Sequence, residues 1–202
     1  MIGILIGAAV LLIAALAAVA ARSSGRTSGE TEAQAYGRAG EVFAAGVISS
    51  LLAPGEQLLT NVRLTHEGQR AEIDELVVSR RGVFAFEIKN YNGTIVGDED
   101  DFEWHKVNTT RSGQTYFRNV KNPIKQVKRQ EYILAHFLRD RGFDVWVEGY
   151  AILLQNNSPV DSKYILTSSA DIDRVLHQGS DQLNDKQVAK ICRILGGGRK
   201  LN

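Results

Sequence analysis

The sequence predicts an α/β domain that follows a membrane-spanning segment, and three observations support this prediction. Residues 2–21 form an uncharged, mostly apolar run that is long enough to cross a bilayer as one helix. Two apolar segments, 72–79 and 83–91, have the composition of strands and are joined by a short turn that contains glycine. Segments 33–52 and 123–141 repeat apolar residues at helical spacing.

The composition limits the class of protein. The 202 residues suffice for one compact domain with short appendages. Lysine and arginine number 24 against 23 acidic residues, a formal net charge of +1, which argues against a sequence-independent nucleic-acid coat protein but permits a local basic patch. The single cysteine, Cys192, excludes an intramolecular disulfide and a zinc site built from several cysteines.

The N-terminal run has two interpretations. Ala18-Val19-Ala20 resembles the cleavage site of a signal peptide, but the run has no preceding lysine or arginine and is longer than a usual signal-peptide core. We therefore favour an uncleaved anchor. Arg22 and Arg26 follow the run, so the positive-inside rule predicts a single-pass membrane protein with its domain on the cytoplasmic side.

This interpretation divides the chain into four parts. Residues 1–21 form the transmembrane anchor, and residues 22–32, which are rich in serine, glycine and threonine, form a flexible linker. Residues 33–196 form the domain, and residues 197–202 form a polar tail.

The elements of the domain follow in order. In the first helix, 33–52, an apolar face is predicted from Val42, Ala45, Ile48 and Leu52, and Pro54-Gly55 ends the helix. Strands are expected at 57–64, 94–96, 145–154 and 164–166, with a hairpin formed by 102–107 and 115–117. Closing helices are expected at 171–177 and 185–195.

The helix at 123–141 has the clearest start signal, with Asn122 as N-cap and Pro123 at the first helical position. Its predicted apolar face consists of Val127, Ile133, Leu134, Phe137 and Leu138.

Charged residues interrupt the two central strands. Glu87 and Lys89 lie two apart in an otherwise apolar strand, so their side chains share one face, and Asp74 interrupts the preceding strand. Charges in such places are costly unless they are paired or bind a metal. Two carboxylates could hold Mg²⁺ or Mn²⁺, and the ammonium could contact a phosphate. A salt-bridged pair of ordinary strands explains the same charges, and the spacing does not separate the two interpretations.

Asp74, followed by Glu87-Ile88-Lys89, resembles the D…(D/E)-x-K signature of restriction-endonuclease-like nucleases. A longer set of short motifs, between residues 36 and 140, resembles the nuclease-related domain (NERD) family. These motifs are Gly40-Glu41, Glu72-Ile73-Asp74, Gly82-Val83-Phe84, Glu87-Ile88-Lys89-Asn90-Tyr91, Gly93, Trp104 and Asn122-Pro123-Ile124-Lys125-Gln126.

The resemblance implies a restriction-endonuclease-like mixed central sheet flanked by helices, and a metal-dependent phosphodiesterase activity. It implies that Asp74, Glu87 and the carbonyl of Ile88 bind the metal, and that Lys89 stabilises the phosphate or activates water. It also implies that Glu41 and Gln126 assist, although an exposed helix glutamate and an exposed or capping glutamine are the plain alternatives.

The chain departs from the family pattern at two positions. Glu75 stands where family members often have histidine, and Ile88 stands where they often have threonine. Neither change removes an expected metal ligand, but a carboxylate at Glu75 that pointed toward the site would alter its affinity for metal or phosphate.

A cationic stretch with interleaved aromatic residues suits phosphate contacts and base stacking. Its members are Arg111, Arg118, Lys121, Lys125, Lys128 and Arg129, with Tyr116 and Phe117 among them. The polar face of the following helix is the alternative explanation. We expect a membrane-anchored, metal-dependent nuclease whose partner is nucleic acid, with DNA favoured over RNA. The alternatives are a tethered nucleic-acid-binding or sensing domain without catalysis and a protein-interaction module.

Overall fold

The structure is a computed structural model that describes residues 31–110, 112–155 and 157–196. The predicted anchor, most of the predicted linker and the predicted tail lie outside these residues, so the proposed division of the chain stays a prediction. Within the described residues, no helix combines the length and the apolar composition that crossing a membrane requires.

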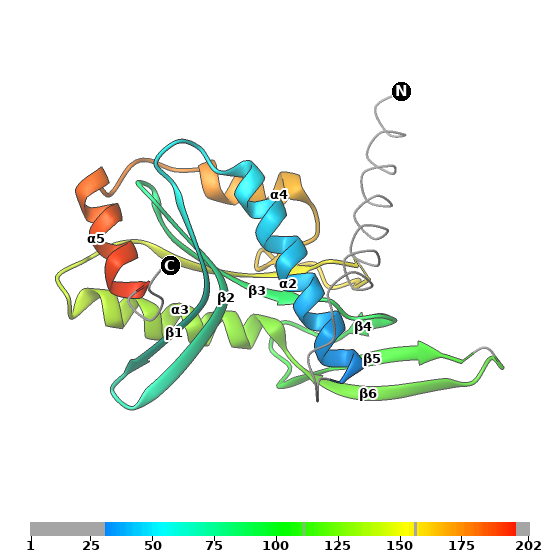
Figure 1. Ribbon diagram of the computed structural model, residues 1–202. Helices are drawn as coiled ribbons and strands as arrows, with labels where there is room; N and C mark the ends of the chain where they lie inside the picture. The colour runs from blue at the N-terminus through cyan, green and yellow to red at the C-terminus, as the bar shows by residue number, and fades with distance from the viewer. Residues whose placement is uncertain (1–30, 111, 156, 197–202) are drawn as a thin grey trace, which may run out of the picture.

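A five-stranded mixed sheet forms the centre of the fold (Figure 1). Its first three strands pair antiparallel, and the last two add in parallel at the β3 edge. The strands, in their spatial order, are β1 (Gln57–His66), β2 (Gln69–Ser79), β3 (Gly82–Lys89), β7 (Val147–Leu153) and β8 (Ile165–Leu166). The predicted mixed sheet is therefore confirmed.

Helices cover both faces of this sheet (Figure 1). On one face, α2 (Glu32–Leu51) and α4 (Ser169–His177) pack on Phe84 and Phe86 of β3. On the other face, α3 (Pro123–Arg139) and α5 (Asp185–Leu195) pack on Val83 and Ala85. Because alternate side chains of a strand point to opposite faces, β3 has no solvated side and its apolar run is fully buried.

A smaller antiparallel sheet lies beside the start of α3. It consists of β4 (Thr94–Val96), β5 (Glu103–Thr109) and β6 (Thr115–Lys121), and the β5–β6 hairpin extends away from the main body (Figure 1). The ring of Trp104 is buried with Ile95 and Ile124, which joins this sheet to α3. Gly97 is required there, because a Cβ at this position would lie 2.2 Å from the ring of Trp104.

The helix starts follow from local capping chemistry. The side chain of Thr31 caps α2 and forms a capping box with Gln34. Asn122 Oδ1 accepts a hydrogen bond from the Ile124 N–H at 2.8 Å, as the sequence predicted for the start of α3. The predicted face of α2 is wrong at Val42, which is 66% exposed. The prediction is confirmed at Ile48, which is buried together with Ala39, Gly40 and Ala44.

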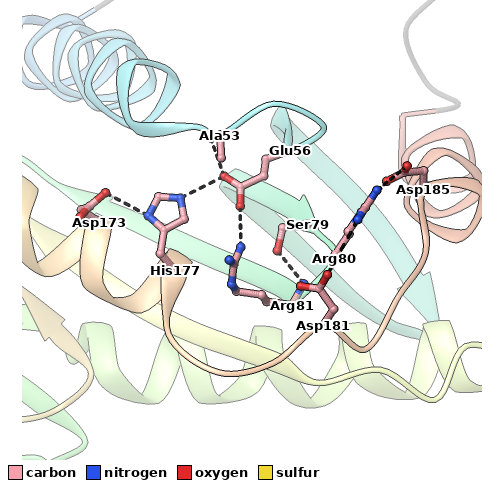
Figure 2. A network of polar contacts seen from close by, with 9 residues as sticks. All are labelled: Ala53, Glu56, Ser79, Arg80, Arg81, Asp173, His177, Asp181 and Asp185. Carbon is pink, nitrogen blue, oxygen red and sulfur yellow. Dashed lines mark hydrogen bonds and ion pairs between the residues drawn. The ribbon is translucent and has the colours of Figure 1, made fainter.

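A polar network ties the start of the sheet to the C-terminal part of the chain (Figure 2). The buried carboxylate of Glu56, just before β1, accepts a hydrogen bond from the Ala53 N–H at 2.9 Å. It also contacts Arg81 at 3.4 Å and His177 of α4 at 3.3 Å. Arg80 forms two hydrogen bonds of 2.6 Å with Asp185 at the start of α5. Side-chain contacts therefore connect the loop before β1 and the β2–β3 turn to the helices α4 and α5.

Candidate active site

The candidate site lies where β2 and β3 separate. Their ladder ends at the pair Glu75 and Phe86, after which β2 continues along β1 only. In the gap, Asp74 Oδ2 accepts a hydrogen bond from the Ile88 N–H at 2.8 Å. The β1–β2 register also omits Asp74 and the opposing Asn61, whose φ is 51°. The local distortion of both ladders leaves room for polar groups between the strands.

The backbone of β3 presents one carbonyl to this gap. The Lys89 carbonyl accepts a hydrogen bond from Leu154 N–H at 3.1 Å, on the β7 side of the strand. Successive carbonyls of a strand point to opposite edges, so the Ile88 carbonyl points toward β2. The Ile88 carbonyl and the Asp74 carboxylate therefore face the same gap.

Glu87 and Lys89 lie on the α3 face of the sheet and contact each other, as their spacing requires. Lys89 Nζ donates to Glu87 Oε1, and the two side chains are 16% and 5% exposed. Gln130 of α3 donates through Nε2 to Glu87 Oε2 and to the Glu72 carbonyl, both at 2.7 Å. Both oxygens of the Glu87 carboxylate therefore have protein partners.

A close approach of α3 to β7 brings Gln130 to this position. A Cβ at Gly149 would lie 2.8 Å from the carbonyl oxygen of Val127, so a larger residue would push the helix away from the strand. Gln130 follows Val127 by one helical turn and projects from the same face of α3.

The helix that carries Glu41 is held near the ends of β3 and β7. A Cβ at Gly40 would lie 2.8 Å from Asn90 Cβ, so α2 crosses the end of β3 closely at this glycine. Asn90 Nδ2 donates to the Tyr36 carbonyl at 3.0 Å, and Gln155 Nε2 donates to Asn90 Oδ1 at 2.8 Å. These contacts hold the half-buried Glu41 near the site.

Electrostatics show that these side chains share one environment. Burial, then the charge of Glu87, raises the pKa of Asp74 to about 7. Burial, then the charges of Asp74 and Glu41, raises the pKa of Glu75 to about 8. Burial, then Glu87, also raises the pKa of Glu41. Burial is the largest single influence on Lys89 and lowers its pKa, but the charge and hydrogen bond of Glu87, with the charges of Tyr91 and Asp74, together outweigh burial, so the pKa of Lys89 is raised. Glu41, Asp74 and Glu87 therefore interact with one lysine, and Glu75 interacts with the first two of these carboxyl groups.

The residues present suit a hard divalent cation. Asp74 and Glu87 offer carboxylate oxygens and Ile88 a carbonyl, which are the ligand types that Mg²⁺ and Mn²⁺ prefer. Within the described residues, no group of three or more histidine, cysteine, aspartate or glutamate side chains could hold a metal, so a site here would depend on the backbone carbonyl and on water. Crowding among the carboxyl groups is what a bound cation would relieve.

Two residues at the site were not assigned a role from the sequence. Gln130 is buried and its Oε1 has no hydrogen-bond partner, and the same holds for Oε2 of the buried Glu75. The sequence did carry a signal for Gln130, because it lies three residues after Val127 and four before Leu134 in the apolar stripe of α3. For Glu75 the signal was a charge beside the apolar run that begins at Leu76.

The remaining residues named from the sequence lie around the site. Gln126 lines a neighbouring cavity, and its side chain makes no hydrogen bond within the described part of the chain. Lys121, Lys125 and Arg129 line the same cavity. Lys128 instead pairs with Glu99 at 2.7 Å. Arg118 lies three residues from Lys121 on β6 and therefore on the opposite face of the hairpin.

A mixed sheet covered by helices on both faces, with acidic residues and a lysine where two central strands part, is consistent with a nuclease-like α/β fold. A family model described as the nuclease-related domain, NERD, matches residues 36–154, more than half of the chain. The chain belongs to this family, which is one of the PD-(D/E)xK superfamily.

The chain is also similar to an uncharacterized protein of Bacillus anthracis, with 30% identity over 103 residues. The match covers 50% of this chain and 48% of that protein, so the chain spans about half the length of this relative. No solved structure matches the chain.

Proposed function

We propose that this protein is a metal-dependent nuclease that hydrolyses phosphodiester bonds of nucleic acid, with DNA favoured over RNA. The observation that carries the proposal is the meeting of Asp74, Glu87, Lys89 and the Ile88 carbonyl at the point where β2 and β3 part. Membership of a nuclease-related family supports the same conclusion.

Each residue has a role that its position suits. Asp74, Glu87 and the Ile88 carbonyl would hold Mg²⁺ or Mn²⁺. A cation of this kind, when bound, polarises a phosphoryl oxygen and lowers the pKa of a bound water. Lys89 would donate a hydrogen bond to a phosphate oxygen and stabilise its negative charge. Gln130 positions the Glu87 carboxylate by its 2.7 Å hydrogen bond.

Two further residues would assist from neighbouring helices. Glu41 extends the acidic surface from α2 and would accept a hydrogen bond from water at the site. Gln126 has an unengaged amide on the first turns of α3, and it would donate to the substrate backbone.

A nucleic-acid-binding or sensing domain without catalysis is the second candidate, and one observation favours it. Lys89 and Gln130 together engage both oxygens of Glu87, which is the arrangement of a structural ion pair. In this case, the cluster would stabilise the sheet and nucleic acid would bind without being cut.

Calorimetric titration of Mg²⁺ and Mn²⁺ into the detergent-solubilised full chain and into Asp74→Ala tests the proposal. Both proteins are then incubated with supercoiled DNA, linear DNA and RNA. Metal binding and cleavage that both disappear in the variant would support the nuclease. Salt-dependent binding of nucleic acid without metal binding or cleavage would contradict it and support the second candidate.

We further propose that residues 2–21 anchor the protein in a membrane, with the domain on the cytoplasmic face. The uncharged run and the arginines that follow it support this proposal. Recovery of the chain in the membrane fraction, with the domain digested by protease only in inverted vesicles, is the expected result. Recovery in the soluble fraction would contradict the anchor.

A further inference from the structure

A cavity of about 880 Å³ lies between the β1–β2 hairpin, the start of β5 and α3. Its lining is strongly cationic, with only Glu72 and Glu103 as acids. The cations are Arg63, Arg70, Lys121, Lys125 and Arg129. They come from two segments far apart in the sequence, 63–70 on β1 and β2 and 121–129 on β6 and α3, so the fold gathers positive charge that the net charge of the chain does not reveal.

Most of this charge is not neutralised by the protein. Arg63 pairs with Glu72 at 2.6 Å. Within the described residues, the other four cations form no ion pair with an acid. Arg129 donates only to a backbone carbonyl, that of Arg70, at 2.8 Å. Four positive groups around one cavity repel each other unless an anion binds among them.

Exposed aromatic rings accompany the cations. Phe102 lines the cavity and is 84% exposed. Along β6 the side chains alternate between faces, so Phe117, which is 69% exposed, shares the face of Lys121. Phe117 and Lys121 are four residues apart, which is about 13 Å along the strand. The hairpin face that lines the cavity at Lys121 therefore continues to a second exposed ring at Phe117.

The cavity adjoins the candidate active site. Gln130 lines it, and the same side chain donates to Glu87 Oε2 at 2.7 Å. A ligand in the cavity would thus lie one side chain away from the carboxylates between β2 and β3.

We propose that this cavity binds an unpaired segment of polynucleotide, which continues along the β5–β6 hairpin. Arg70, Lys121, Lys125 and Arg129 contact its phosphates, and Phe102 and Phe117 stack on its bases. Base faces are accessible to such rings only where the strand is unstacked. The volume is that of sites for small ligands, which suits a few nucleotides rather than a duplex. The inference rests on the proposed function only in taking nucleic acid as the ligand.

Fluorescence anisotropy of labelled oligonucleotides tests this inference in EDTA, where binding is measured without cleavage. The detergent-solubilised full chain is titrated into a single strand of a dozen nucleotides, as DNA and as RNA, and into the matching duplexes. We expect at least one single strand to bind ten times more tightly than its duplex. Equal or tighter binding of both duplexes would overturn the proposal.

Two variants with matched controls test the assigned contacts. Phe102→Ala should weaken single-strand binding about tenfold. Tyr132→Ala, an exposed aromatic residue of α3 outside the cavity lining, should not change it. Lys125→Ala should reduce the slope of log affinity against log salt by about 0.7, whereas Lys186→Ala on α5 should leave the slope unchanged. Unchanged binding by Phe102→Ala would overturn the stacking assignment.

Two further comparisons separate the possible failures. Inorganic polyphosphate that competed as well as the oligonucleotide would show a simple polyanion patch and overturn the inference. A preference for single strands without any cleavage of nucleic acid would contradict the proposed nuclease and leave this inference standing. Cleavage without single-strand preference would contradict this inference alone.

Discussion

The side chains of Glu87 and Lys89 are buried together, so each charge depends on its partner. Removing one member of such a pair leaves an uncompensated buried charge, which costs about 3 kcal/mol. We expect Glu87→Gln and Lys89→Met each to lower the free energy of unfolding by about this amount in EDTA. The double variant should lose less than the sum of the two. Urea unfolding gives the free energy of unfolding of the wild type, the two single variants and the double variant.

The outcome also separates the two candidate functions. A large coupling energy together with lost cleavage means that the pair serves both stability and catalysis. Additive losses would contradict the pairing seen here. Full cleavage by Lys89→Met would remove that residue from the proposed chemistry.

The thiol of Cys192 has little tendency to ionise. Burial raises its pKa to about 11, against about 8.5 for a free thiol. Alkylation by iodoacetamide at pH 8 should therefore be slow, and it should accelerate about tenfold per pH unit up to pH 10. The same measurement in urea gives the unfolded control, where the rate should level off near pH 9. A plateau near pH 9 in the folded protein would contradict the raised pKa.

At the scale of elements, two glycines of α2 are expected to respond in opposite ways to the same change. A Cβ at Gly40 meets Asn90 and Leu154 at 2.8 and 3.0 Å, whereas a Cβ at Gly46 meets nothing within 4 Å. Gly40→Ala should lower the free energy of unfolding by about 2 kcal/mol and displace Glu41. Gly46→Ala should raise it by about 0.5 to 1 kcal/mol, because alanine favours the helix.

Thermal unfolding of the two variants, with cleavage rates alongside, checks this prediction. Gly46→Ala serves as the control in the same helix. Equal effects of the two substitutions would mean that α2 does not lie against the end of β3 as closely as described.

Local patterns predicted the elements well because each depends on neighbouring residues. The apolar run of β3 and the Asn122-Pro123 start of α3 carried enough information by themselves. The buried face of α2 was not predictable at Val42, because the close approach at Gly40, and not average hydropathy, sets the rotation of the helix.

The candidate site also contains contacts that local sequence patterns predict and contacts that depend on how the elements pack. The spacing of two between Glu87 and Lys89 predicted their contact, since a strand places such residues on one face. The contact of Gln130 with Glu87 joins residues 43 positions apart, and it depends on how α3 packs on β7. Strand and helix periodicity do not contain that information, and neither do they show that cations of four elements gather around one cavity.

At the scale of the whole molecule, the family match ends before the fold does. The match stops at residue 154, whereas α4 and α5 supply buried residues to both faces of the central sheet. These residues are Ile172, Val175 and Leu176 on one face and Val188, Ile191 and Leu195 on the other. A core that loses them leaves wide apolar surfaces open to water.

We therefore expect a piece of residues 31–154 to lack a cooperative urea transition and to bind the dye ANS. A piece of residues 31–196 should unfold cooperatively and bind little dye. A sharp, reversible transition of the shorter piece would show that the matched region folds alone and would contradict this prediction.

The polar network around Glu56 cannot form until late in the synthesis of the nascent chain. Glu56 contacts His177 across 121 residues, and Arg80 holds Asp185 across 105. At typical translation rates, roughly 6 to 24 s pass between the synthesis of Glu56 and that of its partner. During this interval, the parts of the β1–β3 sheet faces that α4 and α5 cover in the folded protein have no cover, so this segment is where we expect chaperones to bind.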